Sequence, residues 1–129
     1  MTRPESSGPA RPQVAHRVKS YSAASGYVYQ YYFYEVEKTR RGLATGTDYV
    51  YMVSADRKTV FPVRVFVRHD AVREWSGKAR REMTGTEEYA VAKVRLFQGF
   101  DEAADPAALP RDLVVDGSNL ESLLTALDL

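Results

Sequence analysis

The 129-residue chain contains no cysteine. This absence excludes disulfide bonds, zinc sites built on thiolates and thiol nucleophiles, and it is typical of proteins from a reducing compartment. The first twelve residues contain no apolar segment of signal-peptide length. No uninterrupted apolar run approaches the roughly 18 residues of a membrane-spanning helix. We therefore expect a cytoplasmic protein without a membrane-spanning segment.

Histidine is almost as scarce, because His16 and His69 are the only two in the chain. Two imidazoles cannot complete the usual three-ligand shell of a catalytic zinc ion without carboxylates. Asp101, Glu102 and Asp105 offer oxygen ligands, yet their spacing is not that of a calcium-binding EF-hand loop. The sequence therefore predicts no metal ion and no other cofactor.

The glycines stand singly and form neither a phosphate-binding loop nor a dinucleotide-binding fingerprint. No G-x-S-x-G nucleophile elbow is present, and Asp116-Gly117-Ser118 is better interpreted as a turn followed by a helix N-cap. The adjacent carboxylates of Glu87 and Glu88 point to different sides of a helix, so they do not form an acid-base pair. We predict no catalytic residues and a protein that is not an enzyme.

Tyrosine, by contrast, is concentrated in one segment. Residues 27–37 hold five of the nine tyrosines, and Tyr49 and Tyr51 follow in the next apolar segment. In an extended strand, alternate side chains point to opposite faces. Both faces of this strand are apolar, which favours a central strand or one that is covered on both sides. On one face lie Tyr27, Tyr29, Tyr31 and Phe33, and on the other lie Val28, Gln30, Tyr32, Tyr34 and Val36.

The flanking segments predict further strands. Pro62 lacks an N–H donor, so its strand is expected at an edge or begins pairing only after Pro62. The predicted elements are a weak edge strand at 14–22, a flexible basic loop at 38–46, and strands at 48–54 and 59–68 joined by a short hairpin connection at 55–58.

After position 69 the apolar residues recur at intervals of three and four, which indicates helices. Asp70 is a suitable N-cap for the first helix. Thr84 with Glu87 forms a capping-box pattern that opens the strongest helix, residues 86–103. A short strand at 113–115 follows, and Ser118 caps a last helix.

These elements predict an α+β fold, in which an antiparallel four-stranded meander carries helices on one face in two layers and ends with a short C-terminal strand plus a helix. Residues 1–13 contain Pro4, Pro9 and Pro12 and little apolar surface to offset the entropy of ordering. We expect them to form a disordered N-terminal arm. Residues 14–129 are expected to form a single domain.

Charge is unevenly distributed, although the formal net charge is only +1. Residues 1–100 contain 17 Lys and Arg against 10 Asp and Glu, whereas residues 101–129 contain one against seven. Such an arrangement is compatible with a nucleic-acid-binding face, with docking between subunits, or with neutralisation inside one fold.

The leading functional prediction is a non-catalytic interaction domain, either a homodimer or an adaptor, that uses a tyrosine-rich sheet face for protein contact. Tyrosine and arginine are enriched at binding hot spots. The same rings could instead form a core layer beneath the helices. The predicted contact residues are Tyr29, Tyr31, Tyr49 and Tyr51 or, in the opposite register, Tyr32 and Tyr34, with Arg64 and Arg68 at the rim.

The sequence leaves two alternatives open. Nucleic-acid binding would use the same face together with Arg40, Arg41, Arg57 and Lys58, although the signature of RNA-recognition motifs is missing. A pocket between sheet and helices would bind a small apolar ligand, and its lining residues would be Tyr32, Tyr34, Trp75 and Phe97.

Overall fold

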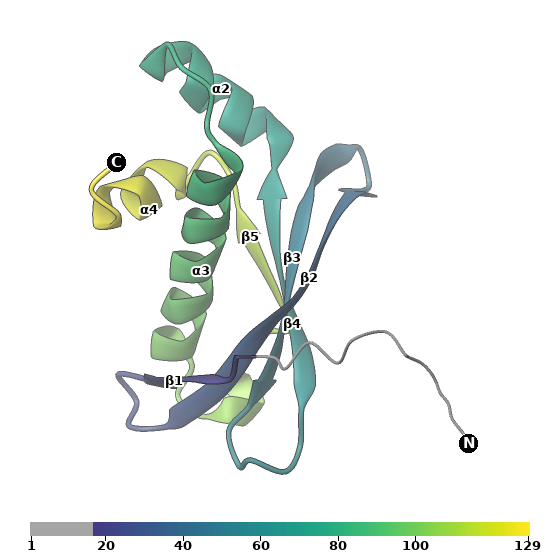
Figure 1. Cartoon of the computed structure of the whole chain (residues 1–129), viewed down its shortest axis with the longest axis vertical. Coiled ribbons are helices and arrows are strands. Elements are labelled where there is room, and N and C mark those ends of the chain that lie inside the picture. The colour runs from purple at the N-terminus through teal and green to yellow at the C-terminus, as the bar shows by residue number, and fades with distance from the viewer. Residues whose placement is uncertain (1–16) are drawn as a thin grey trace.

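The computed structural model describes residues 17–129 (Figure 1). Five strands form one sheet in the order β1-β2-β3-β4-β5. The disordered arm expected at residues 1–13 lies outside the described residues. In chain order the elements are β1 (Lys19–Ser22), β2 (Val28–Arg41), β3 (Ala44–Ser54), β4 (Phe61–Arg68), α2 (His69–Ala79), α3 (Gly85–Glu102), the 3-10 helix η1 (Pro106–Ala108), β5 (Asp112–Val115) and α4 (Leu120–Ala126).

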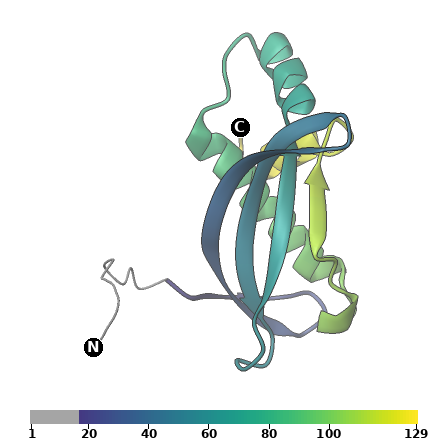
Figure 2. The same ribbon diagram turned by 90° about the vertical axis from the view of Figure 1, so that its right-hand side faces the viewer.

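The predicted α+β fold is confirmed. The helices lie on one side of the sheet, and Figure 2 shows the strands in front with α3 behind them. The first four strands pair antiparallel, as a meander requires, whereas β5 pairs parallel with β4 and completes a mixed sheet. No helix of the described chain covers the opposite side, which we call the open face; the helix-covered side is the covered face.

The main helix, α3, begins as its sequence predicts. The backbone N–H of Glu87 donates to Oγ1 of Thr84 at 3.1 Å, and the backbone N–H of Thr84 donates to Oε1 of Glu87 at 2.9 Å. These bonds satisfy two of the N–H groups that a helix start leaves without partners. Val91, Leu96 and Phe100 then enter the core as the apolar spacing requires.

Two other predicted N-caps are wrong. Helix α2 begins at His69, with Arg68 rather than Asp70 at the N-cap position, which is two residues earlier than expected. The carboxylate of Asp70 binds the guanidinium of Arg68 instead of capping the backbone. Asn119 occupies the N-cap position of α4 without a side-chain cap, while Ser118 donates from its N–H and Oγ to Asp116. In both cases a local polar partner competes with the helix backbone for the side chain.

The predicted loop at residues 38–46 is wrong, because β2 and β3 continue through it as one long hairpin. The two strands remain paired as far as Arg41 and Ala44. Gly42, at a φ of 61°, makes the tight turn that closes the hairpin. Of the weak strand expected at 14–22, residues 14–16 lie outside the described range, and Lys19–Ser22 form β1.

A β-bulge interrupts β2 at Tyr34. Phe33 pairs with Tyr51, but Val50, the next residue of β3 in the ladder, pairs with Glu35. Two residues of β2 therefore oppose one residue of β3, and the alternation of side chains shifts by one. Val36 consequently pairs with Tyr49 on the covered face, contrary to the expectation that it shares a face with Tyr32.

Pro62 lies in an interior strand, because β4 is flanked by β3 and β5. On the β5 side, pairing begins only at Arg64, whose Cα partner is Asp112. The missing N–H of Pro62 therefore removes no bond from the β4–β5 ladder. The prediction that pairing begins after Pro62 holds only on this side, because Phe61 and Pro62 already pair with Val53 and Met52 of β3.

Candidate functional site

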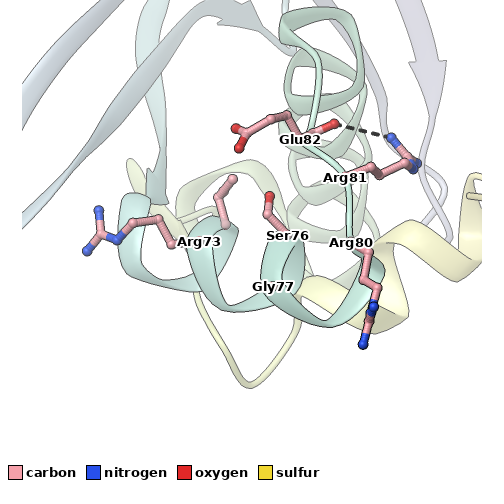
Figure 3. A pocket seen from close by; sticks show the side chains of 7 residues that line it. Arg73, Ser76, Gly77, Arg80, Arg81 and Glu82 are labelled. Carbon is pink, nitrogen blue, oxygen red and sulfur yellow. Dashed lines mark hydrogen bonds between the residues drawn. The ribbon is translucent and has the colours of Figure 1, made fainter.

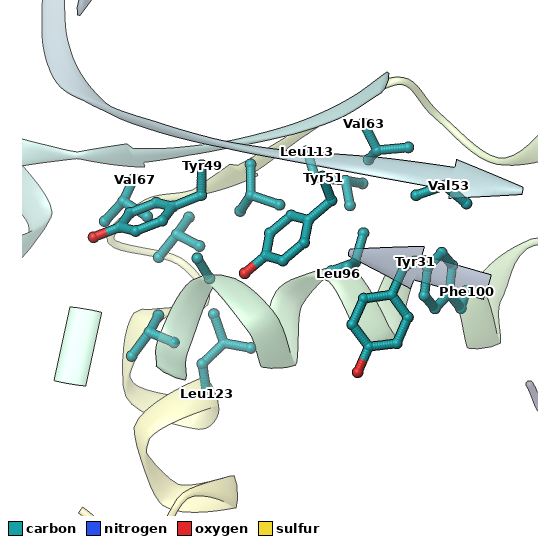
Figure 4. Packing of buried hydrophobic residues seen from close by; sticks show 14 of the residues in the cluster. Tyr31, Tyr49, Tyr51, Val53, Val63, Val67, Leu96, Phe100, Leu113 and Leu123 are labelled. Carbon is teal, nitrogen blue, oxygen red and sulfur yellow. The ribbon is translucent and has the colours of Figure 1, made fainter. Parts of the chain in front are cut away.

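The covered face contains four of the predicted contact residues. Tyr29, Tyr31, Tyr49 and Tyr51 are each at most 5% exposed. Figure 4 shows Tyr31, Tyr49 and Tyr51 projecting from the sheet toward α3. These four tyrosines are core residues that no external partner can reach, because the helix layer already covers them.

The rings of the covered face pack against aromatic side chains of α3. Tyr29 stacks on Phe100 with ring centroids 4.3 Å apart, and Tyr21 stacks on Phe97 at the same distance. Tyr31 meets Phe97 edge-on at 5.6 Å. Offset-stacked and edge-on contacts of this kind add to the energy of simple area burial, so the excess of aromatic residues in β2 serves the core.

Two phenol groups of this face donate hydrogen bonds to carboxylates of α3. The Oη of Tyr49 lies 2.7 Å from Oε1 of Glu88, and the Oη of Tyr21 lies 2.7 Å from Oδ2 of Asp101. The bond to Asp101, together with burial, raises the pKa of Tyr21 to about 12. Burial, with the bond to Glu88 second, raises the pKa of Tyr49 above its ordinary value.

The open face carries the opposite-register residues. Tyr34, at the bulge, is 52% exposed, and Tyr32 is half-buried opposite Met52 of β3. Arg64 and Arg68 lie on this face in β4, at the positions paired with Val50 and Gly46. Arg68 is neutralised by its ion pair with Asp70 at 2.6 Å. The structure thus brings Tyr32, Tyr34, Arg64 and Arg68 onto one face.

Two cross-strand rows organise the centre of this face. The first consists of Tyr32 in β2, Met52 in β3 and Pro62 in β4, and the second of Glu35, Val50 and Arg64 in the same strands. The side chains of Glu35 and Arg64 make no hydrogen bond or ion pair with any residue that the structure describes. Val50 itself is only 2% exposed, so the accessible apolar surface of this face lies in the first row, and the second row continues into β5 with Asp112 beside Arg64.

A cluster of charged side chains around Arg41 and the ring of Phe66 lies near the hairpin end of the open face. The guanidinium of Arg41 lies 2.8 Å from Asp48 Oδ1 and 3.1 Å from Asp112 Oδ1, and 4.6 Å from the ring centroid of Phe66. A Cβ atom at Gly46 would lie 2.6 Å from Cζ of Phe66, so the missing side chain of this glycine leaves room for that ring. Burial raises the pKa of Asp48, and Arg41 opposes this effect. The cluster holds Arg41 in place, so it is not an available phosphate contact.

The residues of the nucleic-acid alternative do not form one patch. Arg40 and Arg41 end β2 next to the start of β3, whereas Arg57 and Lys58 follow the end of β3. Eleven residues of strand separate the two pairs, a distance on the order of 35 Å.

The predicted apolar pocket is not formed. Phe97 packs against Tyr21 and Tyr31 on the covered face, whereas Tyr32 lies on the open face, so the sheet itself separates them. Trp75 lies in α2 under the guanidinium of Arg81, 4.8 Å from the ring centroid. The predicted lining residues therefore never meet.

A hollow of about 490 Å³ lies between α2 and the segment that leads to α3 (Figure 3). Arg73 and Arg80 extend away from it in the figure, and Arg81 is bound to Glu87 at 2.9 Å. The arginines at its rim therefore do not converge on a common ligand position. Its lining residues are Val72, Arg73, Ser76, Gly77, Arg80, Arg81 and Glu82.

With this geometry in view, the chain was compared with protein-family models, curated proteins and solved structures. None of them matches it. Within residues 17–129, no three histidine or acidic side chains gather as a metal site would require. No helix in the same range combines the length and apolar character needed to cross a bilayer. The candidate site is the open face, because it is the side of the sheet that no helix of the described chain covers.

Proposed function

We propose that this protein is a non-catalytic interaction domain that binds a protein partner on the open face of its sheet. The proposal is supported by the difference between the two faces of the sheet. The covered face uses its tyrosines for the core, whereas no helix of the described chain covers the open face (Figure 2), on which Tyr34 is exposed and Tyr32 and Met52 are half-buried. Exposed tyrosine beside arginine is the composition of binding hot spots.

The observation that carries the proposal is the second row of this face. Glu35 and Arg64 lie on either side of Val50 and make no ion pair with a described residue, although Arg64 is close enough to Asp48 to lower the pKa of that carboxyl. Charges that flank an apolar strip steer association and fix the register of a complex. The absence of cysteine is compatible with the reducing cytoplasm, where we propose that the protein works.

The test introduces a charge at the centre of the face. We expect the wild-type chain to associate as its concentration rises in sedimentation velocity, and Met52→Arg to remain monomeric, because a charge buried in an apolar contact is unfavourable. Leu43→Arg is the matched control, because Leu43 is 99% exposed at the tip of the β2–β3 hairpin. Circular dichroism establishes that both variants are folded.

Two results would contradict the proposal. The first is a wild-type chain that stays monomeric over the whole concentration range. The second is a Met52→Arg variant that associates as strongly as the wild type.

A further inference from the structure

We propose that the partner is a second copy of this chain, packed with its open face against the first so that Glu35 of each copy lies opposite Arg64 of the other. This inference rests on the proposed function and specifies the arrangement of the complex. Its basis is the placement of the two charges in one cross-strand row with Val50 between them.

Glu35 and Arg64 make no ion pair with each other within one chain, although side chains of this length can cross more than one strand, as Arg41 does to reach Asp112. Neighbouring strands are about 4.8 Å apart, so residues on β2 and β4 are separated by roughly 10 Å across β3. Arg64 lies close enough to Asp48 to lower the pKa of that carboxyl, but it makes no ion pair with a described residue. Glu35 therefore has no ion-pair partner among the described residues, and Arg64 has the carboxylates of Asp48 and Asp112 as neighbours but an ion pair with neither.

Symmetry determines which groups meet when two identical faces pack together. A two-fold axis lying between the sheets and parallel to β3 exchanges β2 with β4 and preserves the position along the strands. Glu35 then faces Arg64 of the second copy, and Arg64 faces Glu35, as an isologous interface requires. An axis perpendicular to the strands would instead place each strand against itself and bring like charges together.

The neighbouring row agrees with the same axis. Tyr32 of one copy would face Pro62 of the other, and the two Met52 side chains would meet on the axis. Ring-on-proline and methionine contacts are favourable in a dry interface. The apolar centre and the charged flanks therefore select one arrangement.

The bulge in β2 is what creates the charge pair. Because Tyr34 is the additional residue of β2, Glu35 occupies the position opposite Val50. In an uninterrupted ladder Tyr34 would stand in the row with Val50 and Arg64. Bulges re-aim side chains in this manner at functional edges of sheets.

The size of the face sets the expected strength of the complex. Four strands of about eight residues cover an area on the order of 500 Å² per copy. A standard stable interface buries about 800 Å² per partner. We therefore expect a weak dimer whose population depends on concentration and on salt.

Charge reversal tests the pairing directly. We expect Glu35→Arg and Arg64→Glu, each alone, to weaken self-association at least roughly tenfold, because each variant places two pairs of like charges in contact. Mixing the two variants should restore association as a heterodimer, since both contacts are then between opposite charges. The double variant E35R/R64E should also self-associate. Glu82→Arg, in the exposed segment before α3, is the control and should behave as the wild type.

Each outcome has a separate meaning. Rescue on mixing, measured by sedimentation or by fluorescence transfer between labelled variants, supports the face-to-face arrangement. Single variants that dimerise normally would overturn it, as would a loss of association that mixing does not rescue. If Met52→Arg still abolishes association in that case, the proposed function stands and only the pairing is wrong.

Discussion

The Oη of Tyr49 donates a 2.7 Å hydrogen bond to Oε1 of Glu88, from the middle of the sheet to the first turn of α3. An equivalent bond joins Tyr21 to Asp101 near the other end of the helix. The two carboxylates are thirteen residues apart in the sequence, or about 20 Å along the helix axis. Charge-assisted hydrogen bonds therefore join the tyrosines of the covered face to both ends of α3.

We expect Tyr49→Phe to lower the free energy of unfolding by about 1–2 kcal/mol, because the bond is charge-assisted and Tyr49 is buried. Chemical denaturation measures the change. Tyr27→Phe is the control, because Tyr27 is exposed and makes no side-chain hydrogen bond with a described residue. Equal effects of the two substitutions would mean that the bond to Glu88 contributes nothing.

Stability should fall at alkaline pH. The folded-state pKa of Tyr21 is raised from 10.0 to about 12, and those of Tyr29, Tyr31, Tyr49 and Tyr51 are also raised, mainly by burial. The unfolded chain loses these protons first, so the stabilisation is complete below pH 10 and is lost as the pH rises above it.

Ultraviolet difference spectra of phenolate formation, combined with denaturation at each pH, measure this effect. Tyr21→Phe should reduce the loss of stability between pH 10 and 12. An unchanged profile in that variant would contradict the role of its bond to Asp101.

Gly46→Ala should destabilise the protein by about 1–3 kcal/mol, the usual effect of overpacking. A Cβ atom at this position would lie 2.5 Å from the carbonyl oxygen of Val67 and 2.6 Å from Cζ of Phe66. Gly77→Ala is the matched control in the interior of α2, where a Cβ meets no atom within 4 Å. There the gain in helix propensity should stabilise the protein by about 0.5–1 kcal/mol. Thermal denaturation of the two variants should therefore shift in opposite directions.

Arg41→Met should lower the stability at neutral pH by about 1–2 kcal/mol, a value reduced for the partial exposure of the arginine. It leaves the buried carboxylate of Asp48 without its ion-pair partner, and only the more distant Arg64 still acts on it. The pKa of Asp48 is already raised by burial, and it rises further once Arg41 no longer lowers it.

The loss of stability in Arg41→Met should therefore depend on pH. A raised folded-state pKa favours the protonated acid, so the loss is smallest near pH 3.8 and grows as the pH rises and Asp48 must ionise. Arg40→Met, which removes an exposed neighbour without an ion pair in the described chain, should show no such dependence.

The local signals in the sequence predict much of the fold. The capping box of Thr84 and Glu87, the apolar period of α3 and the alternation in β4 act within a few residues, so each is visible before folding. The hairpin through Gly42 was not predicted, because basic residues beside glycine are typical of loops. Cross-strand pairing and the ion pair between Arg41 and Asp48 override that local preference.

The sequence contains one signal from which the bulge could have been predicted. The apolar positions Tyr29, Tyr31 and Phe33 are followed by Val36 rather than by residue 35. A shift from odd to even positions in one strand indicates an additional residue. This shift places Glu35, which the sequence interpretation did not select, in the row with Val50 and Arg64.

The sequence by itself determined that this chain has an unusual amount of tyrosine in neighbouring strands and no thiol chemistry. The tertiary structure alone decided which rings are core and which are surface. The reason is that period-two alternation distinguishes two faces but does not say which of them a helix covers. That choice depends on the packing of α3 through Phe97 and Phe100 against Tyr29 and Tyr31, between residues far apart in the chain.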